Sequence, residues 1–150
     1  MNTPWRLGVL LAVLFVASPL AAASLGSGLT NEGFMIDLTS VERKGSVVTV
    51  KWSVRNDNPK AKYYDIDLAG AGATSYLVDE ESGTKYYALT DKEGHLLATE
   101  TEYDGIYEHI EPGQTMRFWA KFPAPPPAVK TINILMTKSE PFESIAITDK

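Results

Sequence analysis

Carboxylates are the side chains in this sequence whose type and number are best suited to chemistry, because 19 of its 150 residues are Asp or Glu. A hard cation such as calcium takes about six to eight oxygen ligands, which several loops can supply together. Asp65 and Asp67 are two positions apart in an expected strand and therefore point the same way, and Asp57 lies in the preceding turn. These three residues are candidate calcium ligands, although no EF-hand spacing accompanies them.

Glycoside hydrolysis is a second chemistry of carboxylates, in which one acid protonates the leaving oxygen and another acts as base or nucleophile. Glu102, Asp104 and Glu108 lie close together in the stretch from 99 to 114. The histidines, His95 and His109, form no H-E-x-x-H pattern, and no G-x-S-x-G motif is present. We therefore assign no catalytic residue and no cofactor, and we expect a non-enzymatic protein. An envelope glycan hydrolase and a calcium-stabilised structural module are the alternatives.

Aromatic side chains form the third group of candidates, because large, flat and amphipathic rings can anchor a protein or a sugar. In the stretch FWAKF the alternating apolar positions face inward, which leaves Trp119 on the opposite face of the expected strand. The candidate binding residues are Trp119, Tyr86, Tyr87, Tyr76 and Tyr107. Trp119 forms one patch with Tyr86 and Tyr87 if it is exposed beside them, and belongs to the core if other elements cover it.

Three of these tyrosines lie in the stretch SYLVDEESGTKYYALTDKEG, residues 75–94, among acidic residues. A hairpin explains this composition, since Gly83 can adopt the positive φ that short β-loops need and Asp79 can accept hydrogen bonds from nearby amides. Residues 91–94 predict a second turn by the same reasoning. We therefore favour polar turns over a binding site for these acidic residues.

The first 23 residues have the pattern of a secretory signal peptide, with one basic residue, the apolar run LGVLLAVLFVA and the small-residue stretch SPLAAAS. Ala21 and Ala23 satisfy the A-x-A rule, which predicts cleavage between Ala23 and Ser24. The mature chain is expected to begin with a flexible segment at 24–33, followed by one domain at 34–148. It is expected to contain no membrane span and to be periplasmic or secreted.

The composition narrows the choice of partners. The sequence contains no cysteine, so a chain exported to an oxidising compartment depends on its apolar core rather than on disulfides. Its formal net charge is −5, and a negative surface repels phosphate backbones, so we do not expect nucleic-acid binding. The expected partner is a protein or an envelope component, and the oligomeric state is left open.

Apolar and polar residues alternate with a period of two through most of the chain, which is typical of strands with one buried face. In VVTVKWSVRN, Val48, Val50, Trp52 and Val54 share one face, and we expect this strand to pair with FMIDL as a hairpin. Further strands are expected near 63–68, 76–78, 85–89, 115–122, 131–136 and 145–147, and residues 99–114 are expected to be a loop. The predicted fold class is an all-β, immunoglobulin-like antiparallel sandwich of about 7 to 9 short strands.

The proline run PAPPP follows the strand that contains Trp119. Proline has no amide hydrogen and favours polyproline II geometry, so the run ends the strand. It either crosses between sheets as a rigid strap or is recognised by a partner, and its place between two expected strands favours the strap.

Four stretches together carry a resemblance: SYLVDEESGTKYYALTDKEG, IEPGQT, FWAKFPAPPPAVKTINILM and PFESIAI. They resemble a β-sandwich module of exported bacterial proteins that sometimes precedes an OmpA-type peptidoglycan-binding domain. The similarity covers about residues 34–148. It implies an immunoglobulin-like fold and export to the cell envelope, and it brings no catalytic residues with it.

Overall fold

The computed structural model describes residues 23–69, 72–99 and 104–150, and the predicted signal peptide lies outside these ranges except for Ala23. The described residues form strands and no helix, so no helix there is long and apolar enough to cross a membrane. The strands are β1 (Gly26–Leu29), β2 (Phe34–Lys44), β3 (Val47–Asn56), β4 (Lys62–Asp67), β5 (Tyr76–Val78), β6 (Lys85–Tyr86), β7 (Gly105–Ile110), β8 (Thr115–Pro123), β9 (Thr131–Leu135), β10 (Phe142–Ala146) and β11 (Thr148–Asp149). The all-β prediction is confirmed.

One layer of the molecule is a sheet with the strand order β1-β2-β3-β8, in which neighbouring strands are antiparallel. The predicted hairpin is its centre, because β2 pairs with β3 along almost its whole length. The short strand β11 adds to the edge of β2 in parallel, beyond the end of β1. The inward positions of β3 and β8 are apolar and buried or half-buried, as the alternation predicted: Val48, Val50, Trp52, Val54, Met116, Phe118, Ala120 and Phe122.

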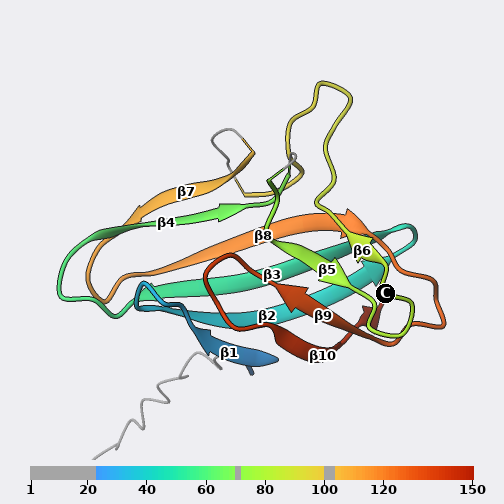
Figure 1. The fold of residues 1–150 in the computed structure, drawn as a ribbon, viewed down its shortest axis with the longest axis horizontal. Coiled ribbons are helices and arrows are strands. Elements are labelled where there is room, and N and C mark those ends of the chain that lie inside the picture. The colour runs from blue at the N-terminus through green and yellow to red at the C-terminus, as the bar shows by residue number, and fades with distance from the viewer. Residues whose placement is uncertain (1–22, 70–71, 100–103) are drawn as a thin grey trace, which may run out of the picture.

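The other layer consists of the sheet β10-β9-β5-β6 and the two-stranded ribbon β4–β7. Figure 1 shows β3 leading into β4, and β7 leading into β8, at the same end of the molecule. The inward residues of the ribbon pack on the first sheet, with the Tyr64 ring 5.5 Å from Phe34 and 5.4 Å from Phe118 between ring centroids. Leu77, Ile132 and Ile134 of the second sheet belong to the same buried cluster. The architecture is therefore a β-sandwich with one apolar core.

Two expected features were wrong. The segment 24–33, predicted to be flexible, contains β1, which pairs with β2 from Gly26 to Leu29. Its glycines gave little strand signal, yet they leave room for the ring of Phe142, which a Cβ on Gly28 would meet at 3.1 Å. The stretch 99–114, predicted to be a loop, contains β7, where the polar Glu108 between Ile106 and Ile110 disguised the apolar alternation.

The two predicted polar turns are confirmed. Gly83 has φ +70°, its amide donates to the Asp79 carbonyl, and the Asp79 carboxylate accepts from the Glu81 amide and the Ser82 hydroxyl. This turn joins β5 to β6. In the second turn the Asp91 carboxylate accepts hydrogen bonds from the amides of Glu93 and His95. The acidic residues of both turns thus shape the backbone, as local chemistry predicts.

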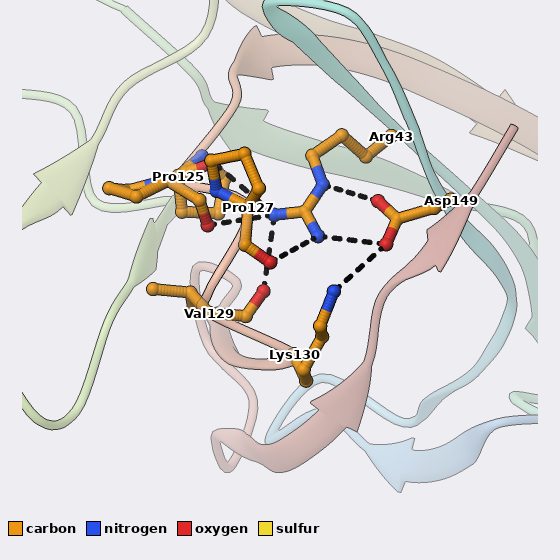
Figure 2. A network of polar contacts seen from close by, with 7 residues as sticks. Arg43, Pro125, Pro127, Val129, Lys130 and Asp149 are labelled. Atoms are coloured by element: carbon orange, nitrogen blue, oxygen red, sulfur yellow. Dashed lines mark hydrogen bonds and ion pairs between the residues drawn. The ribbon is translucent and has the colours of Figure 1, made fainter.

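The proline run is a strap between β8 of the first sheet and β9 of the second, as expected. Its carbonyls converge on the guanidinium of Arg43, which is only 5% exposed (Figure 2). Arg43 donates to the carbonyls of Pro125, Pro126, Pro127 and Val129 at 3.0 to 3.3 Å. It also donates to both carboxylate oxygens of Asp149 at 2.5 and 3.1 Å. Arg43 therefore fixes the strap and β11 to the edge of the first sheet.

Candidate functional site

The outer surface of the first sheet contains the most distinctive candidate site, formed by β3, β8 and one residue of the adjacent β2. We call it the Trp119 face: Thr39, Lys51, Arg117, Trp119 and Lys121. Trp119 is 37% exposed and lies opposite Lys51 in the β3–β8 register. Arg117 and Lys121 are two positions away on either side in the same strand, so they point to the same surface. Trp119 is thus an outward residue with three cationic neighbours.

Backbone pairing on both sides of β8 holds Trp119 in place. The Trp119 amide donates to the Thr99 hydroxyl, and the Thr99 amide donates to the Trp119 carbonyl, both at 2.8 Å. On the other side, β8 is paired with β3. A side chain placed by a paired strand is positioned more accurately than one on a loop. The indole is therefore presented as part of a fixed surface.

A groove of about 270 Å³ opens beside the indole, lined by Thr39, Lys51, Trp52, Arg117, Phe118 and Trp119. The Lys121 ammonium lies 5.8 Å from the centroid of the Trp119 ring, within the range of a cation–π contact. Lys51 is 4.0 Å from Glu42, a loose and half-exposed pairing. The groove thus combines an aromatic wall with basic groups and one hydroxyl.

The predicted tyrosines of residues 75–94 belong to the opposite layer and do not form the predicted patch with Trp119. Tyr76 and Tyr87 pair on the outside of the β5–β6 hairpin with ring centroids 5.5 Å apart, and the Lys85 ammonium lies 4.6 Å from the Tyr76 ring. Tyr86 faces inward, since it lies opposite the buried Leu77 and packs against the core. Partial burial raises the pKa of the Tyr86 hydroxyl above its ordinary value.

The fifth candidate, Tyr107, lies on the outer surface of the β4–β7 ribbon. It stacks on Tyr63 with ring centroids 4.6 Å apart and planes 9° from parallel. His109 lies against the edge of Tyr63 at 4.9 Å. Tyr63 and Tyr107 are 52% and 47% exposed. The grouping of Tyr63 and His109 with Tyr107 was not predicted from the sequence, because nothing local indicates that β4 and β7 pair.

The three candidate calcium ligands do not share a common partner. Asp57 binds the Arg55 guanidinium at 2.6 and 3.0 Å, and this hydrogen bonding lowers the pKa of its carboxyl. Asp65 binds Lys138 at 2.6 Å, while Asp67 points the same way from β4, as predicted. Among the residues that the structure describes, no group of three or more His, Asp or Glu side chains is placed to hold a metal ion.

The carboxylates proposed for glycoside cleavage are only partly described. Glu102 lies outside the described residues. Asp104 immediately precedes β7, and its carbonyl accepts from the amides of Leu68 and Ala69. Glu108 lies within β7, opposite the buried Tyr64. Asp104 and Glu108 are therefore four residues apart along one extended stretch, with Asp104 at the end of the ribbon.

The cationic character of the Trp119 face was not recognised from the sequence, although the signal is present. β3 and β8 contain four Lys or Arg residues and neither Asp nor Glu, in a chain whose acidic residues outnumber its basic ones by 19 to 14. The excess of basic residues is visible only when β3 and β8 are considered as neighbours, and the long stretch of chain between them hides that pairing in the sequence.

Comparison of the chain with protein-family models, with curated proteins and with solved structures gave no match in any of the three.

Proposed function

We propose that this protein is an exported, non-enzymatic accessory protein of the bacterial cell envelope, with an immunoglobulin-like sandwich fold, that binds an envelope component through the Trp119 face. Export is supported by the signal-peptide pattern of residues 1–23, which leaves Ser24 as the first residue of the mature chain. The whole described core, from Phe34 to Ile147, lies within that mature chain.

The observation that carries the binding proposal is the exposed indole of Trp119 in a groove on a regular sheet surface. Large aromatic residues with a water-exposed face are enriched at the energetic centres of binding sites, because one side chain supplies much contact area and loses few rotamers. Within the described ranges, Trp119 is also the largest of the exposed hydrophobic side chains. Its backbone is fixed by Thr99 and β3, so little ordering remains to be done on binding.

The non-enzymatic part of the proposal is supported by what the described carboxylates do. Asp79 and Asp91 accept hydrogen bonds from turn amides. Asp57, Asp65 and Asp149 pair with Arg55, Lys138 and Arg43. These carboxylates thus have structural partners.

Co-sedimentation tests the binding proposal. Residues 24–150 would be purified and mixed with envelope fragments from the bacterium that encodes the protein. The parent protein is expected to sediment with the fragments, and Trp119→Ala to stay largely in the supernatant. Tyr87→Ala, which removes an exposed aromatic ring from the opposite layer, is the matched control and is expected to sediment like the parent. A parent protein that does not sediment would overturn the proposal, as would equal sedimentation of Trp119→Ala.

Export is tested separately with a reporter enzyme that is active only after its disulfides form. Residues 1–33 fused to this reporter are expected to give activity, because disulfides form outside the cytoplasm. Residues 24–33 fused alone are expected to give none. An inactive fusion of residues 1–33 would contradict export.

A further inference from the structure

The charge of the molecule is distributed unevenly between its surfaces. The chain as a whole is acidic, with a formal charge of −5. β3 and β8 nevertheless contribute Lys51, Arg55, Arg117 and Lys121 and no acidic residue. Strand alternation places all four on the outer surface, since the inward positions are the apolar ones. β3 and β8 therefore form a basic stripe on the outer surface of an acidic protein, with Asp37 and Glu42 of the adjacent β2 beside it.

The register brings three of these cations around one indole. Lys51 lies directly across from Trp119, where cross-strand neighbours have Cβ atoms about 5 Å apart. Arg117 and Lys121 lie across from Ser53 and Thr49, one pleat away on either side. Adjacent positions along one face of a strand are separated by about 7 Å. Like charges this close disfavour one another, and a bound anion would relieve that repulsion.

The fourth cation has a different role. Arg55 is held by Asp57 in a two-point ion pair at 2.6 and 3.0 Å. Among the described residues, the ion pairs that these four cations make are this one and the looser contact of Lys51 with Glu42. The basic groups that face a ligand in the groove are therefore Lys51 and Arg117, with Lys121 beside the ring.

The groove has the dimensions of a subsite rather than of an enclosed pocket. Its volume of about 270 Å³ lies below the range of roughly 300 to 1,000 Å³ in which drug-sized ligands are largely enclosed. It is open on a sheet surface and is bounded by the Trp119 ring on one side. It therefore suits one unit of a longer chain that continues over the surface.

We propose that the Trp119 face binds an acidic polysaccharide. One sugar ring of the polysaccharide lies against the Trp119 indole, and carboxylates of this and neighbouring sugars pair with Lys51, Arg117 and Lys121. This inference rests on the proposed function, because it names the ligand class of the same site. The apolar face of a sugar ring matches an exposed aromatic ring. The guanidinium of Arg117 can bind a carboxylate through two parallel hydrogen bonds, and the two lysines add charge.

Direct binding of an oligogalacturonate, measured by calorimetry with residues 24–150, tests the inference. The parent protein is expected to bind this probe and to bind a neutral dextran oligosaccharide of equal length at least about tenfold more weakly. Polyglutamate, which has the carboxylates but no sugar ring, is also expected to bind about tenfold more weakly. Affinity for the oligogalacturonate is expected to fall as salt is added, because salt screens the attraction between the basic side chains and the sugar carboxylates.

Variants separate the ring from the charges. Trp119→Ala and the double change Arg117→Gln with Lys121→Gln are each expected to weaken oligogalacturonate binding about tenfold. Tyr76→Ala is the matched control, because Tyr76 also has a lysine over its ring, at 4.6 Å, but lies on the other layer. The Tyr76→Ala variant is expected to bind oligogalacturonate with the same affinity as the parent protein. Thermal melts of each variant confirm that the sandwich is intact.

Several results would overturn the inference. They are failure of the parent to bind oligogalacturonate, equal binding of dextran or polyglutamate, and unchanged affinity of Trp119→Ala. The envelope assay distinguishes this failure from failure of the proposed function. If the protein sediments with envelope fragments through Trp119 but does not bind oligogalacturonate, the ligand class is wrong and the binding function stands. If it does not sediment at all, the proposed function is wrong.

Discussion

Replacing Arg43 with methionine should destabilise the domain more than removal of any surface charge. The change keeps an unbranched apolar stem of similar volume but removes the guanidinium, and with it six hydrogen bonds: two to Asp149 and four to strap carbonyls. Removing one partner of a buried ion pair typically costs about 3 to 5 kcal/mol. Because the Asp149 side chain is 53% exposed and regains water, we expect the lower end, about 3 kcal/mol.

The loss is measured by urea unfolding of residues 24–150, followed by tryptophan fluorescence, to which the buried Trp52 and the exposed Trp119 both contribute. For a domain of this size the change corresponds to a fall in Tm of about 10 °C. The matched control is Arg55→Met, which breaks an exposed two-point ion pair with Asp57 and should leave the midpoint near the parent's. A loss below about 1 kcal/mol for Arg43→Met, or a loss no larger than that of the control, would refute the buried-clamp account.

Three further changes probe other features of the fold. The Arg43 guanidinium lowers the pKa of Asp149 to about 2 from its ordinary 3.8. The Asp149 carboxylate therefore stabilises the fold above about pH 4, and this stabilisation is lost as the pH falls towards 2. Asp149→Asn should flatten the dependence of Tm on pH between about pH 4 and 2. Tyr64→Phe should cost about 1 to 3 kcal/mol in urea unfolding, because the buried Trp52 indole N–H, 3.3 Å from the Tyr64 hydroxyl, loses its acceptor; an unchanged midpoint would show that this hydrogen bond is unimportant. Gly105→Ala should lower stability by at least about 2 kcal/mol, since the added Cβ would lie 2.0 Å from the Ile66 carbonyl oxygen; a melt like the parent's would mean that the β4–β7 ribbon can shift to admit it.

Strands with regular alternation were predictable from the sequence. β2 and β3 were found because Val48, Val50 and Trp52 repeat with period two and a turn separates the strands. β8 was found for the same reason, and its alternation correctly placed Trp119 on the face opposite the buried Phe118 and Ala120. Whether other elements cover that face was left open by the sequence, and the structure shows Trp119 to be 37% exposed. Local pattern suffices in such cases because burial of one face determines the register.

Features that depend on distant pairing were not predictable. Glu108 interrupts the apolar positions of β7, so only its pairing with β4 reveals the strand. The same pairing stacks Tyr107 on Tyr63. Arg43 looks like an ordinary basic residue at the end of a strand, and its acceptors lie 82 to 106 positions further along the chain. Contacts at such separations leave no periodic signal in one sequence.

The Arg43 clamp also has a consequence for the order of folding. Arg43 lies early in the domain and Asp149 lies 106 positions later, so a chain growing from its N-terminus cannot complete the clamp until Asp149 has been made. The hairpin β2–β3 needs only neighbouring residues and can form long before. We therefore expect the strap and β11 to be among the last parts to become ordered. Until then the strap carbonyls remain accessible to water, and the sandwich stays open along this edge.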